Sequence, residues 1–221
     1  MIDDPSLFWT IVAGIFTVLS FFLTLYLARP GFTIQFLVFV IMGAILGSIN
    51  GLLFGGLASI LLSQSLLLIY MVAFALGEAT KMSLGMLITS RIFQSDTIAV
   101  SVVRGGIKGL IFGIIAGMII WGLRGALIFG IGASISFGVA AVPYNIGTNL
   151  LDNISSKFRR GISGAISGAI SGGFSGLILG IFAGILTGGT REIILFAVGG
   201  EILFAFRDAI LGLFPSSKKY E

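Results

Sequence analysis

Apolar stretches long enough to cross a lipid bilayer follow one another along the whole chain. A membrane-spanning helix needs roughly 20 consecutive apolar residues, and this 221-residue chain is 57% apolar and only 10% charged. Such a composition cannot cover a water-exposed surface. In lipid, the helix satisfies every backbone polar group. We therefore expect an all-α integral membrane protein, a single polytopic domain over residues 1–221 with the lipid bilayer as its first partner.

The apolar stretches divide into about seven predicted transmembrane helices. They cover residues 7–28, 32–62, 65–88, 103–123, 125–142, 161–187 and 192–214. The second and the sixth exceed a minimal span, so we expect them to tilt, break or protrude into water. The stretch 32–62 is also compatible with a short re-entrant piece followed by a span.

The positive charges predict an orientation. Cytoplasmic loops of membrane proteins collect Lys and Arg. With seven spans and the N-terminus outside, 11 of the 13 cations fall on the cytoplasmic side, and only Arg124 and Arg191 fall on the other. A six-span count would lose this asymmetry. We expect an N-terminus outside and a C-terminus in the cytoplasm, in the inner (plasma) membrane of a bacterium.

Two parts of the chain match each other at a fixed offset. Residues 105–138 align with residues 172–205 without a gap, and 15 of the 34 aligned positions are identical. Glycine-rich sequence inflates such identity, but the match of Arg124 with Arg191 lies outside the glycine pattern. A fainter third copy begins with "GLLFGGLAS" at residues 51–59.

The repeat predicts a lead helix followed by three helical hairpins of one orientation. The lead helix covers residues 1–31, and the hairpins cover 32–96, 97–151 and 152–221, the last with a short cytoplasmic tail. Hairpins that share an orientation form a parallel repeat, whose symmetry axis runs along the membrane normal.

The first helix of each predicted hairpin carries glycine at every fourth position. Helices in lipid associate by close van der Waals packing, and small residues let two backbones approach. The pattern therefore predicts helix-packing surfaces of the glycine-zipper type. The predicted packing residues are Gly43, Gly47, Gly51, Gly55, Gly105, Gly109, Gly113, Gly117, Gly164, Gly168, Gly172, Gly176, Gly180, Gly184 and Gly188.

The third stripe is the longest, with seven glycines from Gly164 to Gly188. A spacing of four residues advances about 40° per step around a helix, so we expect this helix to contact at least two partners. The simplest are the other two striped helices or another subunit. Beside it run Ser163, Ser167, Ser171 and Ser175. These hydroxyls either pack as small residues bonded to their own helix or line a narrow wet path.

Three ionisable residues deep in the predicted spans form a candidate intramembrane polar site. Ionisable side chains at bilayer depth are costly, so each is a functional candidate. Glu78 and Lys81 are three residues apart, which places them on one helix face. They form either a local neutralising pair or a transport site. Glu201 lies near the middle of the last span, as either a structural carboxyl or an ion or proton site.

Missing residue types exclude several functions. The chain has no histidine and no cysteine, which removes the usual metal ligands and the commonest general base together. Paired carboxylates at catalytic spacing are also absent, so we predict no enzyme, no catalytic residue, no metal and no cofactor. The net charge is +4, but the Lys and Arg residues lie between apolar runs rather than on a solvated basic face. We therefore expect no nucleic acid partner.

Two functions from different classes remain. The first is a non-catalytic membrane subunit that packs through glycine-zipper helices and binds, anchors or organises other membrane-protein subunits or copies of itself. The second is a pore or transporter for ions or small solutes that uses Glu78, Lys81, Glu201 and the serine stripe. A conducting path normally needs more than one polar stripe, so we favour the subunit.

Overall fold

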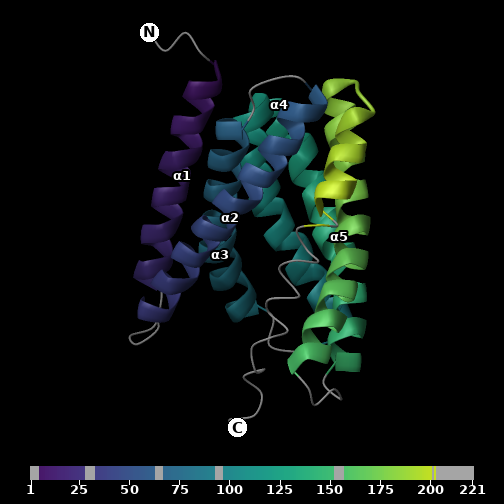
Figure 1. The fold of residues 1–221 in the computed structure, drawn as a ribbon. Coiled ribbons are helices and arrows are strands. Elements are labelled where there is room, and N and C mark those ends of the chain that lie inside the picture. The colour runs from purple at the N-terminus through teal and green to yellow at the C-terminus, as the bar shows by residue number, and fades with distance from the viewer. Residues whose placement is uncertain are drawn as a thin grey trace.

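All regular structure in the described part of the chain is helical (Figure 1). The computed structural model describes residues 5–27, 33–62, 67–92, 97–151, 157–200 and 202, but not the side chains of residues 143–151, 157–164 and a few others. Its helices are α1 (Pro5–Leu27), α2 (Thr33–Leu62), α3 (Leu67–Ile92), α4 (Ile98–Leu151) and α5 (Lys157–Thr187). A turn then leads into a further helical segment, residues 191–200, called here the return helix.

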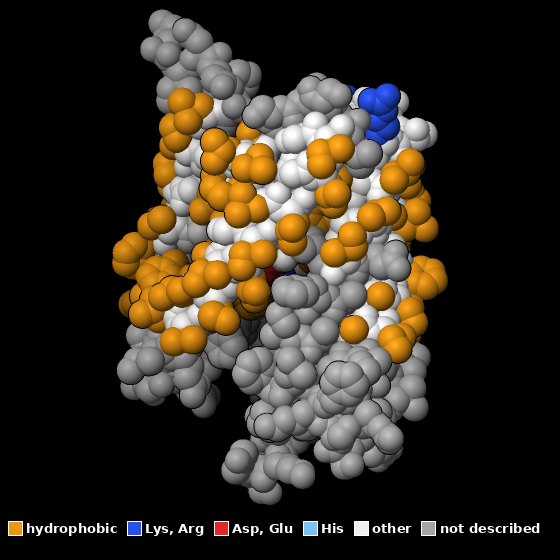
Figure 2. All heavy atoms as spheres, viewed as in Figure 1, with side chains coloured by type: hydrophobic (Ala, Val, Ile, Leu, Met, Phe, Trp, Pro, Cys, Tyr) orange, Lys and Arg blue, Asp and Glu red, His pale blue; other side chains and the backbone are white. Residues whose placement is uncertain are grey.

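Five helices of the described residues are long and apolar enough to cross a membrane. Large apolar side chains point outward from them: Phe22 of α1 is 61% exposed and Ile60 of α2 is 78% exposed. Figure 2 shows such side chains spread over the face that it draws. Water would penalise this much exposed apolar surface, whereas lipid does not. The all-α prediction is confirmed, and the helices are compatible with a membrane location.

The chain reverses direction inside α4, at Gly122. This residue has φ 68° and ψ −157°, a conformation that glycine adopts because it has no Cβ. Beyond it, the second half of α4 runs back along the first half, so that Gly117 faces Gly125 and Gly105 faces Phe137. The predicted spans 103–123 and 125–142 are therefore the two halves of α4. They are counted together as one of the five spanning helices of the described residues. The predicted span 192–214 is described only as far as residues 200 and 202.

Glycines bring the backbone of α2 against the backbone of α3. A Cβ atom placed on Gly55 would lie 2.6 Å from the Leu67 Cα atom, and two turns earlier Gly47 faces the Phe74 carbonyl group even more closely. No side chain fits at such positions, so the two helices form an antiparallel pair in backbone contact. The α2 glycines in this contact are Gly43, Gly47, Gly51 and Gly55.

The same backbone contact occurs between the halves of α4 and between α5 and the return helix. A Cβ atom on Gly113 would lie 2.6 Å from the Phe129 carbonyl oxygen, and one on Gly180 would lie 2.6 Å from the Ile193 Cα atom. Three antiparallel helix pairs therefore depend on glycine. The contact glycines are Gly105, Gly109, Gly113 and Gly117 in α4 and Gly176, Gly180 and Gly184 in α5. Gly168 and Gly172 of α5 are also buried.

Part of the glycine stripe of α5 contacts a neighbour that was not among those expected. From Gly176 to Gly184 the glycines face residues 189–200, and Gly200 closes on the Gly172 carbonyl group. The prediction named the other striped helices or another subunit as partners, whereas these three glycines contact the return helix and the turn before it. The return helix runs back along α5 directly after the turn, so it covers these glycines.

The last glycine of the predicted stripe, Gly188, lies beyond the end of α5. Its φ is 74°, and a Cβ atom on it would have open space around it. The Gly188 N–H donates a 2.7 Å hydrogen bond to the Gly184 carbonyl group, a typical helix ending by a glycine in the left-handed conformation. Gly188 therefore ends a helix instead of packing against one. The surroundings of Gly164 lie outside the described residues.

Aromatic rings from all three helix pairs meet in the centre of the bundle. The ring of Phe54 lies 5.1 Å from that of Phe74 and 5.2 Å from that of Phe196, measured between centroids. Phe129 lies 5.5 Å from Phe196, and Phe112 lies 5.1 Å from Phe74. All five side chains are buried. The glycine contacts join helices within each pair, and these rings join the pairs to one another.

The two aligned segments of the sequence pack in different registers. The alignment places Gly113 on Gly180 and Phe129 on Phe196. Phe129 faces Gly113, whereas Phe196 faces Gly176, which is one helical turn before Gly180. The tight reversal at Gly122 and the longer turn after α5 set these registers, so the sequence match does not extend to equivalent contacts.

Candidate functional site

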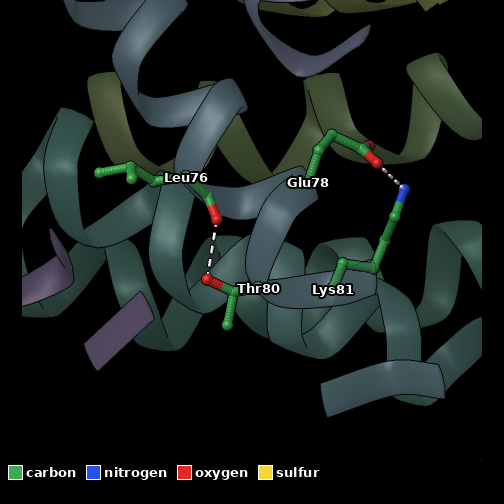
Figure 3. Close-up of polar contacts among 4 residues, drawn as sticks. All are labelled: Leu76, Glu78, Thr80 and Lys81. Carbon is green, nitrogen blue, oxygen red and sulfur yellow. Dashed lines mark hydrogen bonds and ion pairs between the residues drawn. The ribbon is translucent and has the colours of Figure 1, made fainter. Parts of the chain in front are cut away.

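A buried ion pair on α3 occupies the site where Glu78 and Lys81 were expected to act. The two side chains come from adjacent turns of the helix and point toward each other (Figure 3). The side chain of Glu78 is 12% exposed and that of Lys81 is 13% exposed. The predicted pairing on one helix face is present, and it lies inside a candidate membrane span, Leu67–Gly85.

Aromatic rings of α4 surround the lysine. The Lys81 Nζ atom lies 5.8 Å from the centroid of the Phe112 ring and 5.4 Å from that of the Phe137 ring. A cation over an aromatic face is attracted to the ring electrons, and the attraction grows where water is excluded. Phe112 and Phe137 belong to opposite halves of α4, so the ammonium group joins α3 to both of them.

The pair is neutral without help from another helix. A buried ion pair contributes little net stability, but removing one partner costs about 3–5 kcal/mol because the other charge remains buried. A local pair of this kind lets α3 enter an apolar environment with no net charge at this level. The same two groups could also exchange with a charged solute, so the geometry alone is compatible with both roles considered for them.

Basic side chains of α4 lie close to this pair. A Cβ atom on Gly85 would lie 3.0 Å from the Lys108 Cγ atom, so the stem of Lys108 packs on α3 one turn from Lys81. Lys108 is within electrostatic range of both Lys81 and Arg104. Positive charge is therefore concentrated at one end of the α3–α4 contact, the end that the sequence assigns to the cytoplasm.

Paired hydroxyl groups join α1 to α3, and the sequence analysis did not identify them. Thr17 and Thr80 lie 2.8 Å apart between their Oγ1 atoms, and Ser20 and Ser83 lie 3.1 Å apart between their Oγ atoms. In each pair, one hydroxyl can donate to the other, and the accepting hydroxyl donates to a carbonyl group of its own helix. The shared spacing of three residues on both helices was the available signal. It indicates a contact only when the rotation of both helices is known.

Two serines of the α5 serine stripe are described, Ser171 and Ser175, and they make different hydrogen bonds. Ser171 donates a 3.1 Å hydrogen bond to the Gly168 carbonyl group of its own helix. Ser175 pairs with Ser136 of α4, whose hydroxyl donates a 2.9 Å bond to the Ser175 carbonyl oxygen. All three serines are buried. The side chains of Ser163 and Ser167 lie outside the described residues.

The third predicted site residue, Glu201, lies outside the described residues, so the structure does not bring it together with Glu78 and Lys81. A different carboxylate is buried instead. Glu192, at the start of the return helix, is only 7% exposed. Its Oε2 atom has no hydrogen-bonding partner within the described part of the chain. In the sequence it is the first residue of the predicted span 192–214.

The fold and the buried charges define an all-helical protein whose helices are suited to a membrane. Within the described residues, no group of three or more acidic, histidine or cysteine side chains could hold a metal ion. Comparison with protein-family models, with curated proteins and with solved structures gives no match.

Proposed function

We propose that the chain is a non-catalytic integral membrane subunit, a helical block that binds, anchors or organises membrane partners or copies of itself. The observation that carries the proposal is the backbone contact within three helix pairs. Backbones that touch over several turns resist sliding and bending, because every shift would bring a side chain into a space sized for glycine. Hydroxyl pairs at two other seams add directional contacts. A rigid block of this kind suits a scaffold better than a conduit.

In this proposal the complete chain has seven spans. A lead helix over residues 1–31 is followed by three glycine-zipper hairpins in parallel repeat, over 32–96, 97–151 and 152–221. The contact between Trp9 and Gly122 supports a shared orientation, because it places the start of α1 beside the reversal of α4. The distribution of cations supports an N-terminus outside and a C-terminus in the cytoplasm of a bacterial inner membrane.

Partners would bind to an outer face, because the glycines of the three pairs are used within the chain. On α5, Ala165, Ala169 and Gly173 follow one another at four-residue spacing and are half-buried. A Cβ atom on Gly173 would meet nothing within 4 Å. Small residues of this kind let a further helix approach closely, so this row is the proposed contact surface.

Native mass spectrometry of the full chain in lipid nanodiscs tests the subunit proposal. We expect the chain to leave the membrane with a second copy or with another membrane protein. Gly173→Leu should break that assembly and leave the thermal stability unchanged, because its side chain enters open space. Gly56→Leu, at an equally open glycine of α2, is the matched control and should keep the assembly. A stable monomer in the native nanodisc would contradict the proposal.

The Glu78–Lys81 pair favours a second candidate, a pore or transporter for ions or small solutes. Two opposite charges deep in a membrane helix are the kind of group on which transport sites are built. The test is flux into liposomes that contain the purified chain. Transport predicts flux above background that falls at least tenfold in Glu78→Gln. Flux at background in the wild-type chain would leave the pair a structural role only.

A further inference from the structure

The turn between α5 and the return helix holds a buried carboxylate, one of whose oxygen atoms has no hydrogen-bonding partner within the described residues. This turn lies at the top right of Figure 1, at the end of the bundle opposite the start of α5. Glu192 is 7% exposed, and its Oε2 atom is buried without a hydrogen-bonding partner. A Cβ atom on Gly189 would lie 2.5 Å from this oxygen. The carboxylate is therefore folded back over the turn, in space that exists because residue 189 is glycine.

The surroundings of this carboxylate are rich in oxygen. α5 ends at Thr187, and the last carbonyl groups of a helix have no intrahelical partner. These groups carry the negative end of the helix dipole. Tyr70 of α3, itself 2% exposed, is within electrostatic range of Glu192. Arg124 and Arg191 lie near the same end, and both side chains are exposed.

We propose that the Glu192 carboxylate and the carbonyl groups at the end of α5 form a binding site for one small monovalent cation of the Na⁺ class. A buried charge is retained only when an opposite charge and hydrogen bonds or metal contacts satisfy it. Carboxylate and carbonyl oxygens are ligands of hard cations. Transport proteins use the same combination of helix C-termini and backbone carbonyls for coupling ions.

The charge of the site favours a monovalent ion. One carboxylate supplies one negative charge, and the described residues hold no group of three acidic, histidine or cysteine side chains. A divalent ion would keep an excess positive charge in a region with little water. The site does not depend on either candidate function, since a scaffold and a transporter could both hold such an ion.

Equilibrium binding of radioactive Na⁺ to the purified full chain tests the proposal. We expect one ion per chain, and we expect Glu192→Gln to abolish binding because the amide keeps the shape and loses the charge. Glu192→Asp is the matched control, since it keeps the negative charge, and it should still bind Na⁺. Absence of Na⁺ binding by the wild type, or equal binding by Glu192→Gln, would overturn the proposal.

A chemical readout on the wild-type chain covers the case in which Glu192→Gln does not fold. Hydrophobic carbodiimides modify buried carboxyl groups, and a bound ion blocks them. With Na⁺ at 100 times its dissociation constant, modification of Glu192 should slow about 100-fold relative to choline at equal ionic strength, as expected for simple competition. Mass mapping would locate the modified residue. An equal rate in Na⁺ and choline would show that water or a proton satisfies the carboxylate, and would overturn the proposal.

Discussion

Gly173 and Gly180 lie on the same helix, two turns apart, and have opposite surroundings. A Cβ atom on Gly180 would lie 2.6 Å from the Ile193 Cα atom, whereas one on Gly173 would meet nothing within 4 Å. Alanine favours a helix over glycine by about 1 kcal/mol in water. The effect of adding one methyl group is therefore decided by the space that the neighbouring backbone leaves.

Alanine substitutions at these two glycines should change stability in opposite directions. Gly180→Ala should lower the free energy of unfolding by about 1–3 kcal/mol, because the return helix must move away. Gly173→Ala should leave it unchanged or raise it by up to about 1 kcal/mol. Equilibrium unfolding in mixed micelles measures both. Equal effects at the two positions would mean that α5 does not contact the return helix as described.

The ion pair on α3 allows a second prediction at the level of single residues. Lys81→Met leaves the Glu78 carboxylate buried without its partner, so it should cost about 3–5 kcal/mol of unfolding free energy. The double variant Glu78→Gln/Lys81→Met removes both charges and should recover most of that loss. Thermal unfolding of the two variants beside the wild type gives the comparison. Additive losses would show that the two charges act independently.

Local spacing predicted some of these residues and not others. Glu78 and Lys81 were identified because both lie on one helix, where a separation of three residues fixes their relation. Ser20 and Ser83 were not, because their contact depends on how α1 and α3 are rotated, and nothing within either segment states this. Glu192 was missed for a similar reason. Its burial depends on Gly189 letting the chain fold back, which is a property of the turn rather than of the carboxylate.

Helix pairs in this protein are joined in two chemically different ways. Backbone contact at glycine joins α2 to α3, the two halves of α4, and α5 to the return helix. Hydroxyl pairs join α1 to α3 and the second half of α4 to α5. Backbone contacts at glycine therefore lie within the three antiparallel pairs, whereas the hydroxyl contacts join helices of different pairs or join α1 to α3.

Engineered disulfides test the hydroxyl seams, since the natural chain has no cysteine. The Oγ atoms of Ser20 and Ser83 lie 3.1 Å apart, and those of Ser136 and Ser175 lie 2.5 Å apart. Cysteine pairs at these positions should oxidise readily, because the sulfur atoms would replace oxygen atoms that already lie close together. Cysteines at Ser20 and Ser175, taken from different seams, are the control and should stay reduced. Gel mobility after mild oxidation reports the result, and cross-linking of the control pair alone would contradict the arrangement.

The sequence predicted elements better than it predicted their partners. Apolar length placed the spans 7–28 and 65–88 within a few residues of α1 and α3. The boundary expected between residues 123 and 125 coincides closely with the reversal at Gly122. The return helix, which contacts Gly176, Gly180 and Gly184, was not among the partners predicted for the α5 stripe, because an argument from helical rotation ignores how tightly the following turn returns the chain. Turn geometry also shifted the register of the sequence repeat by one helical turn.

At the scale of the whole molecule, the two cations that the sequence places outside the cytoplasm, Arg124 and Arg191, lie at one end. Arg124 follows the reversal of α4, and Arg191 follows the turn after α5. The contact of Trp9 with Gly122 places the beginning of α1 at the same end as the α4 reversal. An N-terminus outside the cell would therefore place Arg124 outside with it, and the shared orientation of the hairpins would do the same for Arg191.

Single cysteines test this orientation. In intact bacterial cells, a membrane-impermeant maleimide should label Arg124→Cys and Arg191→Cys, because both side chains are exposed at the end that the cation distribution places outside. Lys157→Cys, at the start of α5, should be labelled only after the membrane is opened. Labelling of Lys157→Cys in intact cells would reverse the proposed topology, and labelling of one arginine position without the other would contradict the shared orientation of the hairpins.

The reversal at Gly122 constrains how the protein is made. A single residue with non-helical backbone angles separates the two halves of α4. No linker would therefore let the first half enter a bilayer before the second half is made. We expect both halves to enter the membrane together, as one folded pair. A bulky residue at Gly122 would therefore act during biosynthesis, by leaving the nascent chain as one helix too long for the bilayer, before any mature protein existed to be destabilised.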